Sequence, residues 1–316
     1  MSEASTSSHP PLYYWDLRAL SWSLLSLRGA ARSAFLQRLL TLDLRQLSPG
    51  ECQRAFLLDH RGRCESAIYL SAPHVGAEAL GHLALCPPEQ ERALIEALDR
   101  YHFGEDISWA PAPLALFCFH SAAALRVAQL ISEESWAALK LTAPLFGPES
   151  LTLALSPEEA ERLTERCEEA GFMLGSQSEW EALRLSCGYP EAPSEYHRQH
   201  SPLDWGMAGI SEGKGCYPGQ EVIERSIALG RAARRPAHLW VPGFPEGHPI
   251  PEVGAPIFGA QGEGEARPVG TVSSAARAGG ALHLLASLKR SAEAPLSLAQ
   301  GTFSEPLQLL EVPMHH

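Results

Sequence analysis

The sequence predicts an α+β protein that ends in a small all-β domain. Between residues 12 and 230, apolar runs of strand length are interspersed with segments whose apolar residues recur at helical spacing. After Pro236, short β-type segments are separated by glycine and proline, as in small all-β domains. The 316 residues, 45% of them hydrophobic, are enough for two or three domains with cores of their own.

The individual elements follow from local patterns. Gly29 ends a strand over 22–27, and a helix is expected over 33–40. Apolar runs over 55–59 and 64–70 flank a turn at 60–63 and predict a hairpin. Pro87 and Pro88 open a helix with one apolar stripe, and 114–119 is a buried strand. Ser156 and Glu159 form a capping box for a helix through Glu169. The expected C-terminal strands are 238–241, 256–258, 269–274 and 281–287.

Charge and hydropathy exclude several classes of protein. A formal net charge of −12 disfavours direct binding to nucleic acid or to an anionic membrane. The sequence shows neither the run of about 18 apolar residues that a membrane span needs nor the basic-then-apolar order of a signal peptide. We therefore expect a cytoplasmic protein. Residues 1–11, rich in Ser, Thr and Pro, are expected to be a disordered tail.

The seven cysteines predict neither a disulfide framework nor a metal site. They are scattered and never form a C-x-x-C pair, so most should be reduced and buried. His197 and His200 have an i,i+3 spacing that suits a metal on a helix, but prolines surround them and no third ligand is evident. We expect no metal.

The most unusual segment lies between Gly213 and Arg225. Glycines bracket Cys216 and an aromatic residue, so the loop can hold strained backbone beside a ligand. Lys214 would favour the thiolate of Cys216, which makes this cysteine the best candidate for reactivity. A purely structural turn also fits, with Glu221 and Arg225 paired at i,i+4.

This segment resembles the signature K-G-C-Y-x-G-Q-E of the YgfZ family, relatives of the glycine-cleavage aminomethyltransferase. The matching positions are Lys214, Gly215, Cys216, Tyr217, Gly219, Gln220, Glu221 and, downstream, Arg225. Three further segments resemble family motifs: Gly29 to Asp43, Leu57 to Arg63, and Leu183 to Pro190. Two positions depart from the pattern, because Ala31 stands where an acidic residue is usual and Ser186 replaces a glutamate.

The resemblance implies an aminomethyltransferase-like folate-binding fold of three modules. Residues 12–50 and 150–230 would form a discontinuous first domain, 51–149 an inserted ferredoxin-like domain, and 231–316 a C-terminal β-barrel. Tetrahydrofolate, or a derivative, would lie in the central cavity, with the Cys216 loop at its rim. Trp22 and Trp180 occupy matching offsets and would contact the folate, because indoles can stack on a flat heterocycle. A role in the core explains such tryptophans equally well.

The expected site is therefore catalytic at Cys216 and Lys214 and folate-binding at a second set of residues. That second set is Trp22, Trp180, Tyr217, Gln220, Glu221 and Arg225. YgfZ-like proteins support the maturation or repair of iron–sulfur enzymes, including tRNA-modifying ones. The resemblance thus implies an accessory protein that meets iron–sulfur enzymes or cluster carriers transiently, rather than a turnover enzyme.

Two other hypotheses remain open: a folate-dependent aminomethyl or one-carbon transferase, and a folate sensor without chemistry. Ala93 aligns with the catalytic carboxylate of the aminomethyltransferases, and Ser186 with their folate-contacting glutamate, which argues against transfer. Glu89 and Glu91 are possible replacements, although a solvated helix start also explains them.

Overall fold

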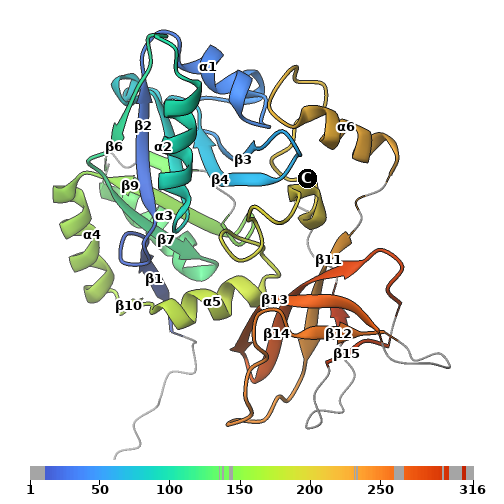
Figure 1. Ribbon diagram of the computed structural model, residues 1–316. Helices are drawn as coiled ribbons and strands as arrows, with labels where there is room; N and C mark the ends of the chain where they lie inside the picture. Colours follow the sequence, from blue (N-terminus) through green and yellow to red (C-terminus); the bar gives the residue numbers. More distant parts are fainter. Residues whose placement is uncertain are drawn as a thin grey trace, which may run out of the picture.

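The computed structural model describes residues 11–134, 136, 139–141, 145–230, 232, 234–259, 267–293, 295–298 and 308–310. The expected N-terminal tail, apart from Pro11, lies outside these residues. The described residues form three sheets and six α-helices, so the predicted α+β class is confirmed (Figure 1). None of these helices is both long enough and apolar enough to cross a membrane.

Two five-stranded sheets form the body of the molecule. The first has the order β10-β1-β7-β9-β8. Its strands are β1 (Tyr13–Asp16), β7 (Ala115–His120), β8 (Leu139–Leu141), β9 (Ser150–Leu155) and β10 (Met173–Leu174). The second has the order β3-β4-β5-β2-β6. Its strands are β2 (Ser23–Arg28), β3 (Cys52–Leu58), β4 (Cys64–Ser71), β5 (His82–Cys86) and β6 (Ser108–Pro111).

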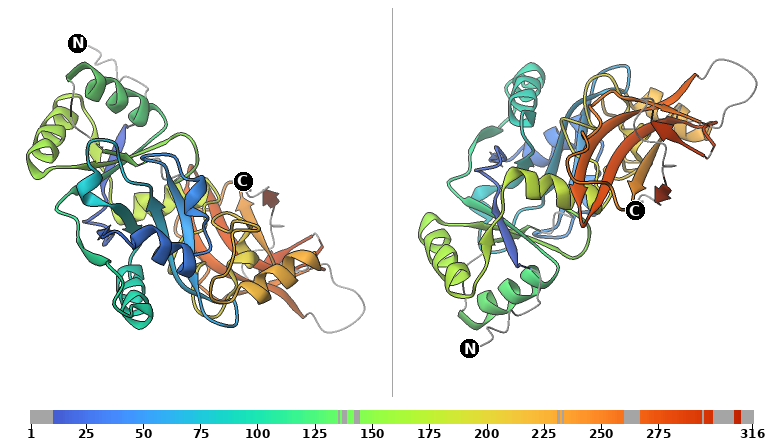
Figure 2. Two further views of the ribbon diagram at one scale, coloured as in Figure 1. Left: turned by 90° about the horizontal axis from the view of Figure 1, so that it is seen from above. Right: turned by 90° about the horizontal axis from the view of Figure 1, so that it is seen from below.

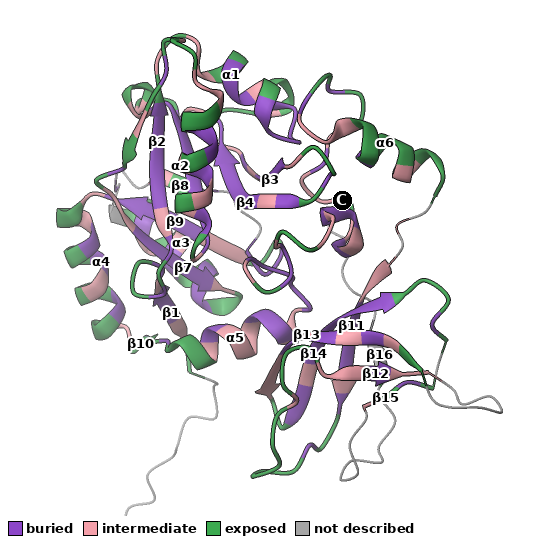
Figure 3. Ribbon diagram, viewed as in Figure 1, coloured by how far each residue is buried: buried purple, intermediate pink, exposed green. Residues whose placement is uncertain are grey.

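Alternation along the strands shows that these two sheets pack face to face. Leu116 and Cys118 of β7 belong to the same core cluster as Leu24 of β2. Phe117 and Phe119, the alternate residues of β7, face away from this cluster into a second one. Because successive strand side chains point to opposite faces, both sheets are buried on both sides. The central strands are accordingly buried along most of their length, whereas β6 and β10 at the sheet edges are largely exposed (Figure 3).

Helices cover the outer faces of the two sheets. On the first sheet, α3 (Ala122–Glu134) and α4 (Pro157–Glu169) pack against β7 and β9. On the second, α1 (Arg32–Leu39) and α2 (Gln90–Tyr101) pack against β2, β3, β4 and β5. The capping box at Ser156 and Glu159 is present, as predicted. The body is thus a four-layer α/β/β/α sandwich. The molecule as a whole is elongated in both views of Figure 2.

The C-terminal segment forms a third, antiparallel sheet at one end of the molecule (Figure 2). Its order is β15-β12-β13-β14-β11-β16. The strands are β11 (Arg234–Val241), β12 (Pro256–Phe258), β13 (Pro268–Ala278), β14 (Ala281–Lys289), β15 (Ser297–Leu298) and β16 (Gln308–Leu310). An all-β C-terminal segment was expected. Within the part of the chain that the structure describes, β15 and β16 each pair on one side only, so barrel closure stays a prediction.

Sheet membership crosses both expected boundaries within the body. Strand β2, from the expected first domain, pairs with β5 and β6. Strand β7, from the expected inserted domain, pairs with β1 and β9. Neighbours in sequence therefore lie in different sheets, and the division into domains remains a prediction.

Two further helices complete the fold and shape the candidate site. Helix α5 (Gln177–Ser186) runs between the body and the C-terminal sheet, and α6 (Gln220–Ala228) lies on the surface (Figure 1). Three short 3-10 helices lie at Leu44–Gln46 (η1), Glu78–Leu80 (η2) and Pro202–Trp205 (η3).

Candidate functional site

One face of α5 forms a wall of a cavity of about 290 Å³. The lining residues of this helix, Gln177, Trp180, Glu181 and Arg184, follow the i, i+3, i+4, i+7 spacing of a single helical face. A capping box fixes the start of the helix, because Ser176 Oγ accepts from the backbone of Glu179 and the Glu179 carboxylate accepts from the backbone of Ser176. The opposite walls come from residues 20–22, Pro88 and residues 191–194.

The two predicted tryptophans meet at this cavity. Trp22 and Trp180, which belong to separate motifs, both line it, and their ring centroids lie 5.8 Å apart in a T-shaped arrangement. Trp22 also stacks on Tyr69, and the ring centroids of Trp180 and Phe146 lie 4.5 Å apart. Their exposed fractions are only 4% and 3%. Both rings are therefore core residues as well as cavity wall, and each presents little surface to a ligand.

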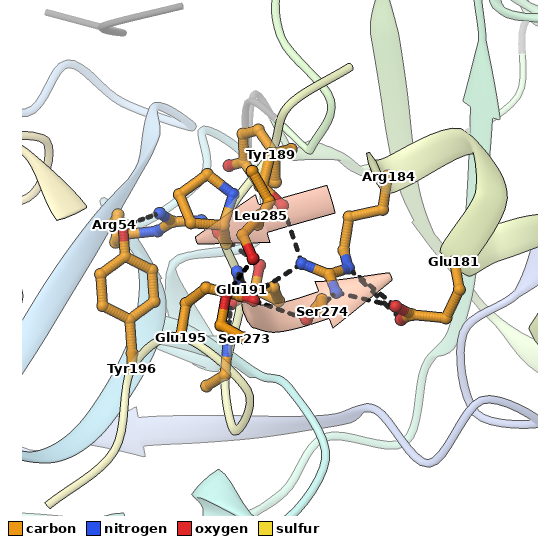
Figure 4. Close-up of polar contacts among 12 residues, drawn as sticks. Arg54, Glu181, Arg184, Tyr189, Glu191, Glu195, Tyr196, Ser273, Ser274 and Leu285 are labelled. Carbon is orange, nitrogen blue, oxygen red and sulfur yellow. Dashed lines mark hydrogen bonds and ion pairs between the residues drawn. The ribbon is translucent and has the colours of Figure 1, made fainter. Parts of the chain in front are cut away.

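A buried arginine holds the cavity wall in place. Arg184 is 2% exposed and donates to Glu195 at 2.8 Å and to the carbonyl of Tyr189 at 2.9 Å (Figure 4). Its other nitrogens donate to Glu181 at 2.7 Å and to Ser274 Oγ of β13 at 3.0 Å. The same guanidinium thus joins α5, the segment after it and the C-terminal sheet.

A second buried arginine fixes the opposite wall. Arg54 of β3 donates to Tyr196 Oη at 2.7 Å and to the carbonyl of Pro190 at 2.9 Å (Figure 4). Its guanidinium also lies over the rings of Tyr69, Tyr189 and Tyr196, at 4.7 to 5.1 Å from their centroids.

Arg54 also contacts a carboxylate of the cavity wall. Its guanidinium lies 3.3 Å from Glu191, which accepts from Tyr69 Oη at 2.5 Å and from the Ala192 backbone at 2.9 Å. Burial raises the pKa of Glu191, and the guanidinium opposes this rise. Both oxygens of Glu191 already have protein donors.

The motif loop is built from glycine and docks on the β3–β4 hairpin. Gly213, Gly215 and Gly219 all have positive φ, at 68°, 103° and 77°. A side chain at Gly219 would meet the carbonyl of Asp59 at 2.4 Å. Only glycine therefore fits this close approach. The predicted turn at Gly62, which also faces the loop, supplies the docking surface.

Lys214 ties the loop to the end of α1. It is buried, and its ammonium donates to the carbonyl of Gln37 at 2.5 Å and lies 4.9 Å from the Tyr217 ring centroid. Burial lowers the pKa of Lys214 to about 8, although the nearby Asp43 carboxylate opposes this effect. The lysine that was expected to activate a thiol is thus also an anchor of the backbone.

Cys216 is the exposed cysteine of this chain; five others are buried and Cys187 is partly buried. Tyr217 is buried and lines a second cavity of about 210 Å³ between the loop and α6. Gln220 donates to Glu224, while Glu221 and Arg225 are exposed on α6. None of the residues that line the tryptophan cavity comes from the motif loop. The structure therefore brings Trp22 and Trp180 together but separates them from the rest of the predicted set.

The structure shows which contacts are made at the two positions, Ala31 and Ser186, that depart from the family pattern. Beside Ala31, the backbone of Ala30 donates to the Asp106 carboxylate at 2.9 Å. Ser186 Oγ donates to the carbonyl of Leu183 and lies outside the cavity lining. Arg184 was not predicted as a site residue, although it lies in the Leu183 to Pro190 segment that resembles a family motif.

No protein-family model matches the chain. By contrast, curated proteins and a solved structure are similar to the chain. The "tRNA-modifying protein YgfZ" of Serratia proteamaculans is 27% identical over 290 residues, which cover 87% of this chain and 83% of the relative. The protein of the same name from Sodalis glossinidius is 28% identical over 254 residues, covering 75% and 73%. The chain is a homologue of the YgfZ proteins.

The crystal structure of glycine cleavage system aminomethyltransferase T from Bartonella henselae matches with a TM-score of 0.78 and 14% identity. This match covers 96% of the YgfZ-like chain and 86% of the transferase, and it confirms the predicted aminomethyltransferase-like fold.

Proposed function

We propose that this YgfZ homologue binds tetrahydrofolate, or a derivative, in the tryptophan-lined cavity and acts as an accessory protein for iron–sulfur enzymes, including tRNA-modifying ones. The observation that carries the proposal is the meeting of Trp22 and Trp180 with two carboxylates and an arginine around one cavity. The lining combines apolar and aromatic residues with charged and polar ones, and small-molecule sites likewise combine the two kinds of group. The names of the relatives support the link to tRNA modification. We expect the protein to act in the cytoplasm.

The binding step is tested by calorimetric titration with tetrahydrofolate. Because both tryptophans are core residues, Trp→Ala would leave large cavities, so Trp22→Phe and Trp180→Phe are the better variants. Trp205→Phe is a matched control, since Trp205 is equally buried but belongs to another cluster. We expect each cavity variant to weaken binding about tenfold and the control to leave it unchanged. Equal affinity in all four proteins would remove the tryptophans from the site.

We propose further that Cys216 is the functional thiolate, which contacts a cluster, a persulfide or a partner protein transiently. Its exposure on a loop apart from the cavity suits a partner-facing role. Complementation of an iron–sulfur-enzyme defect by Cys216→Ala tests this role, with Cys187→Ala as the control. We expect loss of rescue with Cys216→Ala only. Full rescue by Cys216→Ala would exclude the thiolate.

A folate-dependent one-carbon transferase is a second candidate, favoured by one observation. Although Ala93 and Ser186 lack carboxylates, Glu181 and Glu191 both line the cavity. In this candidate they would serve as the acid–base groups. Formation of methylenetetrahydrofolate from tetrahydrofolate and an aminomethyl donor, with release of ammonia and of the free carrier, would favour this candidate if it is lost in Glu191→Gln. No turnover by the wild type would exclude it.

A further inference from the structure

The second cavity, between the motif loop and α6, combines apolar side chains with two carboxylates. It shares no lining residue with the tryptophan-lined cavity. Its apolar surface includes Ile210 and, from one face of α6, Ile227 and Ala228. Glu212 and Glu224 also line it, and both are exposed to solvent. Because none of the described lining residues is a lysine or an arginine, the cavity is negatively charged.

A buried tyrosine in this cavity has a hydroxyl without a partner. Tyr217 is 8% exposed and lines the cavity, and its hydroxyl forms no hydrogen bond with any residue that the structure describes. Burial and the nearby Glu224 carboxylate raise the pKa of Tyr217 to about 12, so the hydroxyl keeps its proton at neutral pH. Unpaired polar groups are rare inside proteins because they cost free energy. The free hydroxyl therefore points to a ligand with a polar group.

The motif itself orients one of the two carboxylates. Gln220 Nε2 donates to Glu224 Oε1 at 2.5 Å, across one turn of α6. Within the described part of the chain, neither Glu224 nor Glu212 forms an ion pair. Both carboxylates can therefore accept hydrogen bonds from a cationic ligand.

These groups together fit the side chain of a lysine or an arginine. Its alkyl part can pack on apolar side chains while its charged end reaches carboxylates. An N–H donor at the same end can also be accepted by the Tyr217 hydroxyl oxygen. Cys216 directly precedes Tyr217, and Gly213 of the same loop lines the cavity. A protein segment that inserts a basic side chain here would therefore lie beside the exposed thiol.

We propose that the second cavity binds a lysine or arginine side chain of the partner protein and so brings a cysteine of the partner to Cys216. This inference rests on the proposed role of Cys216 and goes further, by stating the chemistry of the partner. The partner would carry a basic residue within a few positions of a cysteine. Tyr217 and Gln220 would then serve partner recognition, the first directly and the second through Glu224.

Thiol–disulfide exchange with short peptides tests this proposal. The probes are acetyl-Cys-Gly-Lys-amide and its analogues with norleucine or glutamate in place of lysine, each joined by a disulfide to thionitrobenzoate. The Cys216 thiolate attacks the peptide sulfur, so that one S–S bond forms, one breaks, and thionitrobenzoate leaves as a coloured thiolate. Analogues with one or two further glycines before the lysine vary the spacing. The rate measured with Cys216→Ser is subtracted as the background from other cysteines.

Norleucine resembles lysine without the charge, so the ratio of the two rates reports the carboxylates. With the best spacing, we expect the lysine peptide to react about fivefold faster than the norleucine peptide, the upper range for an exposed ion pair. The glutamate peptide should be the slowest. The advantage of lysine should be lost at about 1 M salt, where exposed charges are screened.

Two variants and a matched control locate the effect. Glu224→Gln should lower the ratio of lysine to norleucine rates to less than about twofold. Tyr217→Phe should lower it by about half without loss of stability in urea, because the hydroxyl has no protein partner to lose. Glu133→Gln is the control: Glu133 accepts from Gln129 at i,i+4 and 2.8 Å, as Glu224 does from Gln220, but it lies on α3. It removes the same charge and should keep the wild-type ratio.

The outcomes separate this inference from the proposed function. If Cys216→Ser reacts as fast as the wild type, or Cys216→Ala gives full rescue, the role of Cys216 fails. If Cys216 reacts and the wild type shows no preference for lysine, or folded Glu224→Gln keeps that preference, partner recognition by the second cavity alone is overturned. A preference that falls in Glu224→Gln and Tyr217→Phe but not in Glu133→Gln supports it.

Discussion

Side chains at the tryptophan-lined cavity are buried and held by several partners, whereas the motif loop carries an exposed thiol on a glycine-rich backbone. Arg184 and Arg54 fix the cavity walls through side chains from distant parts of the chain. The loop is fixed by the Lys214 side chain, which donates to the Gln37 backbone, and by the close approach of its backbone at Gly219. This difference suggests two tasks: a preformed pocket for a small ligand and an accessible residue for a larger partner. The following changes test the contrast.

The largest loss of stability is expected when Arg184 is replaced. Arg184→Met leaves Glu195, which is fully buried, without its charged partner. Loss of one member of a buried pair destabilises by about 3–5 kcal/mol. Urea unfolding should show this loss. Arg166→Met, which breaks an exposed pair, should lower the free energy of unfolding by less than about 1 kcal/mol. Similar small losses in both variants would contradict the view that the cavity wall depends on Arg184.

A smaller loss of stability is expected when Gly219 is replaced. In Gly219→Ala the new Cβ would clash with the Asp59 carbonyl, in addition to the strain of a positive φ. We expect a loss of about 2–3 kcal/mol and faster proteolysis of the loop. Gly213→Ala is the control, because it also has a positive φ but nothing lies within 4 Å of its Cβ, so only about 1 kcal/mol should be lost. Equal losses would mean that docking on the hairpin contributes nothing.

Lys214 should give stability a characteristic pH dependence. Its pKa is about 8 in the folded protein and 10.5 when the side chain is free in water, as in the unfolded chain, so between these values the unfolded chain binds more protons. The Lys214 contribution to the free energy of unfolding therefore rises with pH across this window, with a slope of up to about 1.4 kcal/mol per pH unit. Below pH 8 the burial of the charge is fully unfavourable.

Comparison with Lys214→Met isolates this contribution. The difference in the free energy of unfolding between wild type and variant, measured from pH 7.5 to 10, should shift in favour of the wild type as the pH rises. A difference that is constant over this range would show that the Lys214 ammonium is not desolvated in the folded protein.

The smallest structural effect is expected at Cys216. Because the side chain is exposed, Cys216→Ser should change the free energy of unfolding by no more than about 0.5 kcal/mol. The same variant should nevertheless remove the fast phase of iodoacetamide labelling from the native protein. If the fast phase persists, another cysteine is the reactive one, with the partly buried Cys187 as the first to examine.

Sequence patterns predicted much of the local structure. The strand at β2, helices α1 and α2, the β3–β4 hairpin, strand β7 and the capped helix α4 lie close to their expected positions. Their signals are local, since periodicity, caps and turn residues act within a few positions along the chain. Helices α5 and α6 were not delimited, because we interpreted both segments through family motifs rather than through their apolar periodicity.

The sequence by itself determined the fold class, the family resemblance, the single K-G-C-Y-P-G-Q-E loop and the two candidate tryptophans. Only the tertiary structure decided that Trp22 and Trp180 touch, that Lys214 is buried against Gln37, and that the loop is separate from the cavity. It also revealed Arg54 and Arg184, whose partners lie up to 142 and 90 residues away. Such pairings depend on how the two sheets of the body and the C-terminal sheet pack together, and no local spacing along the chain encodes that packing.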